Sequence, residues 1–123
     1  MNLMEENLYH DFLLFHWRNP QNYGRLKNAN KRAISDNPFC GDVIEMEAEI
    51  KDDKIKKIRF SGKGCIISIA SASLLTEYVK NKKISELKKL DKDFILKLLN
   101  IKLGPTRLKC ALLSLDVLKK LIQ

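Results

Sequence analysis

The sequence feature that most constrains the fold is a run of strict alternation, DVIEMEAEI, at residues 42–50. Its apolar and acidic side chains fall on opposite sides of an extended chain: Ile44, Met46, Ala48 and Ile50 on one, Glu45, Glu47 and Glu49 on the other. A period of two predicts a strand with one buried face. Whatever else the chain forms must therefore cover that face.

The segment after this strand predicts its hairpin partner. The polar run KDDK at residues 51–54 reads as a turn, and Ile58 and Phe60 then alternate with Lys57 and Arg59. Aligning the apolar faces also aligns the glutamates with Lys57 and Arg59. We expect cross-strand ion pairs there, each contributing about 0.2–1 kcal/mol and together fixing the register.

The flanking segments predict one further strand and several helices. Residues 2–18 form a helix with Leu8, Phe12 and Phe15 at helical spacing, ended by Asn19 and Pro20; a loop over 21–32 precedes a short strand in RAISDNP at 32–38. After the hairpin, a helix over 65–81 has a face of Ile67, Ala70, Leu74 and Tyr78. Residues 84–90 and 92–100 are short helices, and a last helix over 107–122 has a stripe of Leu108, Ala111, Leu115, Leu118 and Ile122. The prediction is one α+β domain over 1–123, a three-stranded antiparallel sheet packed as two layers against about five helices.

Bulk properties narrow the function classes. The 123 residues carry a net charge of +8, but the lysines are spread along the chain with no recognition helix or aromatic-basic motif, so we expect an acidic protein partner and no nucleic acid. No apolar run approaches the ~18–20 residues of a membrane span, and the N-terminus has no signal-peptide pattern. We expect a cytoplasmic protein without membrane contact, in which thiols stay reduced.

The three cysteines are widely spaced, and the hairpin topology can bring them together. Cys40 precedes the long strand, Cys65 follows the second strand, and Cys110 lies in the first turns of the last helix. The two outer ends of a hairpin meet, so Cys40 and Cys65 can converge where the last helix begins. Nearby helix N-termini and the basic neighbours Lys63, Arg107 and Lys109 favour thiolates, and Gly41, Gly62 and Gly64 permit close backbone approach. The alternative is three small buried hydrophobic residues.

Asp42 favours a metal site over that alternative. Three thiolates and a carboxylate complete a tetrahedral set of ligands for Zn²⁺ or iron. The carboxylate is a hard ligand in a soft set and binds such metals more weakly than a fourth thiolate. We therefore expect Cys40, Asp42, Cys65 and Cys110 to form a site that can open on one side. The histidines His10 and His16 read as surface or packing residues, and Ser68, Ser71 and Ser73 as polar groups within helix packing.

The motifs around these residues resemble those of a known family. NPFCGD, GKGCIISIASAS and RLKCALLSLDVL are similar, in order, to the three cysteine motifs of the U-type iron–sulfur cluster scaffold proteins (IscU, the NifU N-terminal domain and SufU), and FHWRNPQNYGRL is similar to their NPRNxG signature. The resemblance implies an IscU-like fold and transient assembly of a [2Fe–2S] cluster from iron and desulfurase-derived sulfur. It also implies that Cys40, Asp42, Cys65 and Cys110 ligate the cluster or metal, and that the partners are a cysteine desulfurase and recipient apo iron–sulfur proteins. Because zinc is redox-inert and fits tetrahedral sulfur, we further expect about one zinc or none per chain in aerobically purified protein.

Two branches of that family remain open. Scaffold members usually carry LPPVKxHC before the last cysteine, whereas this chain has LGPTRLKC, with Lys109 in place of a histidine; this puts recognition by the family's Hsp70-type chaperone in doubt. Residues 107–111 instead resemble the RxKCA of SufU, yet the inserted segment typical of that branch is missing. We expect a scaffold and not an enzyme. The alternatives are a zinc-dependent sulfur acceptor, with Cys110 as the candidate acceptor, and a zinc-stabilised binding domain, which Asp42 argues against.

Overall fold

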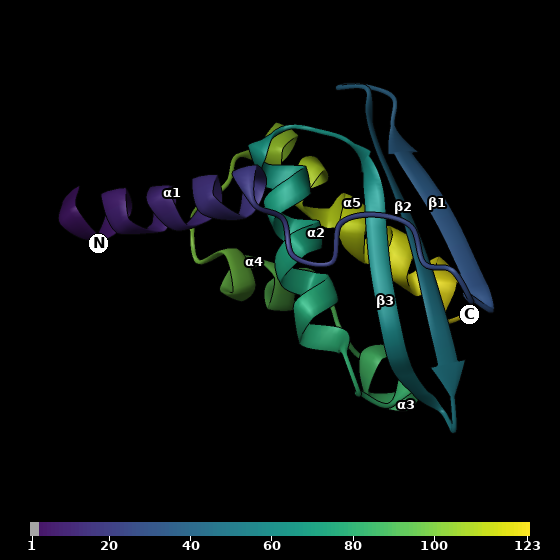
Figure 1. Ribbon diagram of the computed structural model, residues 1–123. Coiled ribbons are helices and arrows are strands. Elements are labelled where there is room, and N and C mark those ends of the chain that lie inside the picture. The colour runs from purple at the N-terminus through teal and green to yellow at the C-terminus, as the bar shows by residue number, and fades with distance from the viewer. Residues whose placement is uncertain (1–2) are drawn as a thin grey trace.

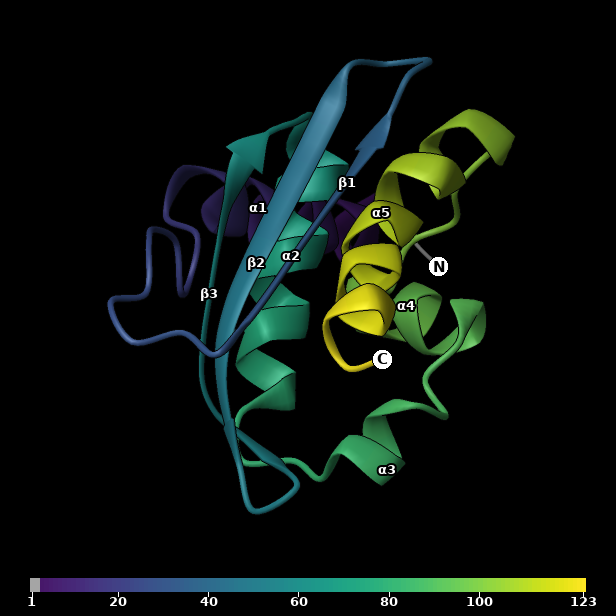
Figure 2. The same ribbon diagram turned by 90° about the vertical axis from the view of Figure 1, so that its right-hand side faces the viewer.

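A three-stranded antiparallel sheet forms one layer of the structure and helices form the other (Figures 1 and 2). The computed structural model describes residues 3–123, and side chains from residue 10 onward. The strand order is β1-β2-β3. The elements are α1 (Leu3–Arg18), β1 (Lys31–Asn37), β2 (Asp42–Lys51), β3 (Lys54–Lys63), α2 (Ile66–Val79), α3 (Ile84–Leu87), α4 (Lys92–Leu99) and α5 (Pro105–Leu121). The predicted α+β fold class is confirmed.

The β2–β3 hairpin forms with the register that the apolar alternation predicts. Met46 lies opposite Phe60 and Ala48 opposite Ile58, and all four are at most 2% exposed. The turn between the strands holds Asp52 and Asp53 at positive φ, 55° and 61°. Two consecutive residues in this conformation match the right-handed twist of the strands they connect.

The predicted ion pairs between β2 and β3 are wrong, although the register that suggested them is right. Glu47 lies opposite Arg59 and is only 2% exposed, but its oxygens lie 2.9 Å from Arg25 Nε and 2.8 Å from Arg32 Nη2. Arg25 comes from the loop before β1, and it also lies 2.6 Å from Glu45. The planar guanidinium groups suit carboxylate pairs, so these two arginines, and not the cations of β3, neutralise Glu45 and Glu47.

Helix α2 is buried on more sides than an amphipathic helix would be. The predicted face is too narrow: Ile67 and Ala70 are buried, but Tyr78 is 38% exposed, and residues such as Ile69 and Leu75 are buried instead. The reason is its position, since α2 contacts β3, α1, α4 and α5. Its small residues allow this, and the structure shows Ser71 Oγ donating to Ala111 O of α5 at 2.8 Å.

Helix α1 presents a different face to the body from the one predicted. Phe12 and Phe15 are 42% and 53% exposed, whereas Leu13 and His16 are 2% and 8% exposed; the side chain of Leu8 lies outside the described residues. Figure 1 shows α1 extending away from the two layers, with only its C-terminal end against α2. Most of α1 therefore does not cover the two layers, so the helical spacing of its apolar residues does not indicate which of them are buried.

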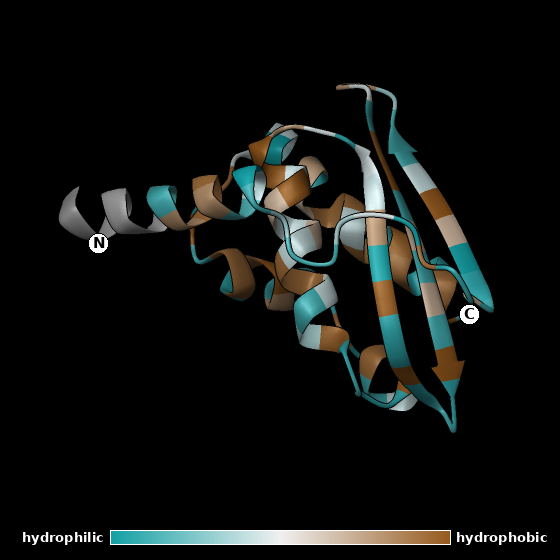
Figure 3. Ribbon diagram, in the orientation of Figure 1, coloured by the Kyte–Doolittle hydropathy of each residue, from teal (hydrophilic) through white to brown (hydrophobic). Residues whose placement is uncertain are grey.

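The core lies between the sheet and α2 and α5, where apolar residues from all these elements meet (Figure 3). In α5, Ala111, Leu115, Leu118 and Ile122 of the predicted stripe are buried, and Leu108 is half-buried. Within residues 3–123, no helix combines the length and apolar character needed to cross a bilayer. The packing of α5 on β1 and β2 also fixes where Cys110 lies.

Candidate metal and thiol site

Cys40 lies in the tight loop between β1 and β2, at one end of the sheet. Asn37 organises this loop: its backbone oxygen accepts from Gly41 N at 2.8 Å, and its side-chain oxygen accepts from Phe39 N at 3.1 Å. Gly41 has φ of 76°, a conformation that other residues rarely adopt. The loop therefore holds Cys40 at its tip, and the side chain is exposed.

Asp42 is the first residue of β2 and is almost fully buried, with 5% of its surface exposed. Its Oδ2 atom has no hydrogen-bond partner among the described residues. Gly64 lies beside this carboxylate and makes room for Ser68, because a Cβ there would lie 2.0 Å from Ser68 Oγ and at ordinary contact distance, 3.5 Å, from Asp42 Cγ. A buried, unpartnered carboxylate oxygen costs free energy, and a cation would satisfy it.

Cys110 completes a cluster with these two residues. Its sulfur lies 3.7 Å from that of Cys40, and one ligand atom each from Cys40, Asp42 and Cys110 lie within 4.8 Å of one another. Cys65 lies just outside this cluster: it is the exposed N-cap residue of α2, and with Cys110 it lines a cleft of about 420 Å³. The structure thus brings three of the four predicted ligands together and places the fourth beside them.

The Cys110 thiol does not have the lowered pKa that a helix N-terminus would give. Burial, the hydrogen bond with Cys40 and the nearby Cys65 thiol raise the pKa of Cys110 to about 12. Cys110 is the sixth residue of α5, and the helix dipole acts mainly within the first turn. Without metal this thiol is protonated at neutral pH, and deprotonation would accompany metal binding.

Aromatic and basic residues surround the thiols. Phe39 is 82% exposed, and Lys109 Nζ lies 4.5 Å from its ring centre. Trp17 of α1 and Arg107 line the cleft that Cys65 and Cys110 share. Sequence reasoning identified Lys109 and Arg107 from their neighbours, but it missed Phe39 and Trp17. The large apolar residue directly before Cys40 was a usable signal for Phe39, whereas the position of Trp17 depends on how α1 packs.

His16 and the three serines of α2 take packing positions, whereas His10 lies on the surface. His16 is buried, and its Nδ1 atom lies 2.8 Å from Ser73 Oγ, which also accepts from Gln21 N at 2.8 Å. Burial lowers the pKa of His16, against an opposing effect of Glu77. His10 is exposed. Neither histidine belongs to the cluster of candidate ligands found among the described residues.

Fold and site together define a small α+β protein with three thiols and a buried carboxylate at one end of its sheet. The chain matches the NifU-like N terminal domain over residues 8–123 and belongs to that family, the U-type iron–sulfur scaffold proteins. It is 33% identical over 115 residues to iron–sulfur cluster assembly scaffold protein IscU 1 of Archaeoglobus fulgidus, covering 94% of this chain and 74% of the relative. It is also 33% identical over 132 residues to the zinc-dependent sulfurtransferase SufU of Bacillus subtilis, covering 94% and 89%.

A solved structure supports the same assignment. The crystal structure of a putative iron–sulfur cluster assembly scaffold protein for the SUF system from Fervidobacterium islandicum AW-1 superposes with a TM-score of 0.80 at 26% identity. The match covers 92% of this chain and 95% of that one. Both the scaffold and the sulfurtransferase names therefore occur among relatives that share nearly the whole chain.

Proposed function

We propose that this protein is a scaffold on which a [2Fe–2S] cluster is assembled from iron and desulfurase-derived sulfur and then passed to recipient apo proteins. The observation that carries the proposal is the buried Asp42 carboxylate, which has an oxygen without a partner among the described residues and lies with the sulfurs of Cys40 and Cys110. Together with Cys65 these residues offer three soft ligands and one hard one. Thiolates hold iron–sulfur clusters, and the carboxylate is the ligand most easily displaced when the cluster leaves.

The position of Cys65 fits a site that opens and closes. It is exposed, at the start of α2, and faces the cleft it shares with Cys110 and Trp17. A cluster seated between Cys40, Asp42 and Cys110 would need only a local movement of this N-cap to gain its fourth ligand. The cleft gives iron and sulfur a route to the thiols.

A second function, zinc-dependent sulfur acceptance, has its own support. The SufU relative is named a sulfurtransferase, and residues 107–111 resemble the motif of that branch. The thiol set also fits Zn²⁺, which prefers tetrahedral sulfur ligands. In this role Cys110 would accept sulfur from the desulfurase while Asp42 and the other thiols hold zinc.

The alignments favour the scaffold. The alignment with the SufU relative is 132 residues long, more than the 123 residues of this chain, so that relative contains residues that have no counterpart here. The alignment with the scaffold relative is only 115 residues long. This difference is consistent with the missing inserted segment.

Anaerobic reconstitution separates the two functions. We expect aerobically purified protein to carry about one zinc or none per chain, and protein reconstituted with iron, cysteine and a cysteine desulfurase to develop the visible absorption of a [2Fe–2S] cluster. Cys40→Ala should lose this absorption because a thiolate ligand is gone. A parent protein that never forms a cluster but, when loaded with zinc, accelerates desulfurase turnover would overturn the scaffold in favour of sulfur acceptance.

A further inference from the structure

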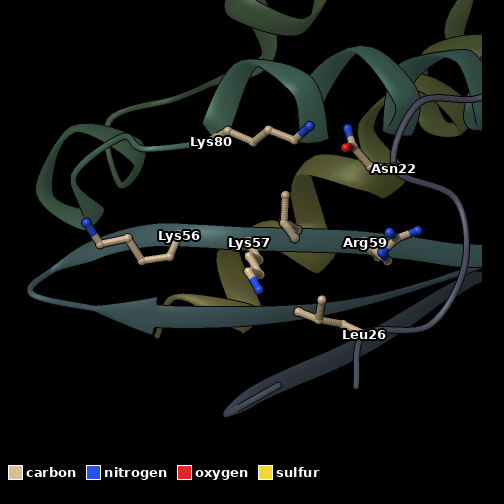
Figure 4. A pocket seen from close by; sticks show the side chains of 7 residues that line it. Asn22, Leu26, Lys56, Lys57, Arg59 and Lys80 are labelled. Carbon is tan, nitrogen blue, oxygen red and sulfur yellow. The ribbon is translucent and has the colours of Figure 1, made fainter. Parts of the chain in front are cut away.

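A groove with a strongly cationic lining lies along the edge of β3, away from the thiols. Its volume is about 480 Å³ (Figure 4). Figure 4 shows lysine and arginine side chains from β3 around it, together with Lys80 just after α2 and residues of the loop before β1. The lining residues are Asn22, Leu26, Lys56, Lys57, Ile58, Arg59 and Lys80. None of the candidate metal ligands is among them.

The positive charge of this groove is largely uncompensated. Lys80 pairs with Glu77 at 3.0 Å, but Lys56, Lys57 and Arg59 form no ion pair within the part of the chain whose side chains are described. No carboxylate is among the described lining residues, and Glu77, which also accepts from Asn22 Nδ2 at 3.0 Å, lies only at the Lys80 end. For Arg59 the reason is the pairing described above, in which Glu47, the residue opposite it, is taken by Arg25 and Arg32.

The groove also lies where the free edge of β3, an edge strand of the sheet, is only partly covered by other segments of the chain. At one end of β3, Phe60 exchanges backbone hydrogen bonds with residues 22–24, at 2.9 and 2.8 Å. At the other end, Ile55 does so with residues 81–82, at 3.2 and 2.7 Å. Ile58 lies between these two covers. In an antiparallel ladder, hydrogen-bonding direction alternates along the strand, so the N–H and C=O of Ile58 face the same free edge as those of Phe60.

Outside the β2–β3 ladder, neither group has a backbone hydrogen-bond partner among the described residues. Ile58 as a whole is only 2% exposed, so the groove side chains that cover these two groups must move aside before a partner strand can reach them. A covered backbone donor and acceptor without partners is costly. The groove thus combines cations that form no ion pair with one strand residue that lacks a backbone partner at its free edge. A ligand with negative charge and a backbone of its own would satisfy both.

We propose that this groove binds a short, extended, acidic segment of a partner protein. The backbone of the segment would pair with Ile58, and carboxylates on either side would contact Lys56, Lys57 and Arg59. The two covers of the edge limit the paired segment to about three or four residues, at about 3.3 Å each. A DNA strand would meet the cations, but its backbone carries no donor for the Ile58 carbonyl. A peptide supplies donor, acceptor and negative charge together.

The test is fluorescence anisotropy with a labelled, end-capped peptide of sequence Asp-Val-Glu-Val-Asp. The groove variant is Lys56→Gln/Lys57→Gln, and the matched control is Lys89→Gln/Lys97→Gln, which loses the same charge at exposed positions on the opposite layer. We expect the groove variant to bind about fivefold to tenfold more weakly than the parent, and the control to stay within about twofold. Circular dichroism of both variants checks that the fold is unchanged.

Two further probes separate charge from strand pairing. A peptide with the acids replaced by Asn and Gln should not bind, and one N-methylated at its central residue should bind more weakly, because it has lost a donor. The proposal is overturned if the peptide does not bind the parent, if both double variants bind equally, or if N-methylation has no effect. It is overturned in favour of nucleic acid if a single-stranded DNA oligonucleotide binds more tightly than the peptide and loses that affinity in the groove variant. Cluster reconstitution is independent of every outcome.

Discussion

At the residue scale, Asp42 shows a conflict between stability and function. It is buried, and one of its oxygens has no hydrogen-bond partner among the described residues. Local physical chemistry disfavours such a group, and such exceptions concentrate at functional sites. The same carboxylate that destabilises the metal-free protein is available to a cation. Asp42→Ala is therefore expected to make the metal-free protein more stable and to make cargo transfer slower.

Asp42→Ala is expected to stabilise the metal-free protein while slowing cluster release. Removing an unsatisfied buried polar group should raise the free energy of unfolding by about 1 kcal/mol, measured by urea unfolding with a chelator present. The variant should still assemble a cluster on its thiolates, yet transfer it to an acceptor more slowly than the parent. Asp36→Ala, at an exposed position of β1, is the control and should change neither quantity. A destabilised variant with unchanged transfer would contradict the role given to Asp42.

His16 is expected to make the fold sensitive to mild acid. Its pKa in the folded protein is lowered by burial from the ordinary value of 6.5, so the fold prefers the neutral ring. The stability from this preference is present above about pH 6.5 and is lost as the pH falls through that value. Urea unfolding at about pH 7.5 and about pH 5.5 should therefore show a decrease in unfolding free energy that His16→Asn reduces and His10→Asn, at an exposed position, does not. An unchanged pH dependence in His16→Asn would contradict this assignment.

At the element scale, the sequence predicts strands better than helix faces. One face of the sheet is covered, so period-two alternation reports burial directly, as at Met46 and Ile58. Helix α2 is covered on several sides and most of α1 on none, so neither shows the single stripe that periodicity assumes. Hairpin connectivity predicted that Cys40 and Cys65 converge where the last helix begins; the structure places Cys110 of that helix against Cys40 and leaves Cys65 just outside the cluster. The pairing of Glu47 with Arg25 could not be predicted from the sequence, because it depends on the path of a loop.

The β2–β3 turn offers a test of backbone strain. Asp53 has φ of 61°, and glycine is the preferred second residue of such a two-residue turn. Asp53→Gly should therefore raise the free energy of unfolding by about 0.5–1 kcal/mol. Asp93→Gly is the matched control, since residue 93 lies in the first turn of α4 and glycine costs about 1 kcal/mol within a helix. Thermal unfolding of both variants should give shifts of opposite sign, and shifts of the same sign would count against strain at residue 53.

At the scale of the whole molecule, the cations behind the net charge of +8 include two separate basic surfaces. One is the groove along β3. The other surrounds the thiols, where Lys63, Lys109 and Arg107 are exposed. A positive molecule attracts acidic partners over about 10 Å at moderate salt, but the local arrangement decides where each one docks. A partner that delivers sulfur must reach the cysteines, so the second surface is the one a desulfurase should meet.

Lys63→Glu/Lys109→Glu is therefore expected to slow association with a cysteine desulfurase and to reduce the salt dependence of that rate. Lys89→Glu/Lys97→Glu has the same net charge and lies outside both basic surfaces, so it separates a local effect from general attraction. At low salt the first variant should associate about tenfold more slowly than the second, and the two rates should approach each other at about 1 M salt, where the Debye length is about 3 Å. Surface plasmon resonance over this range measures both rates. Equal association of the two variants at low salt would show that the basic residues beside the cysteines do not form the docking surface.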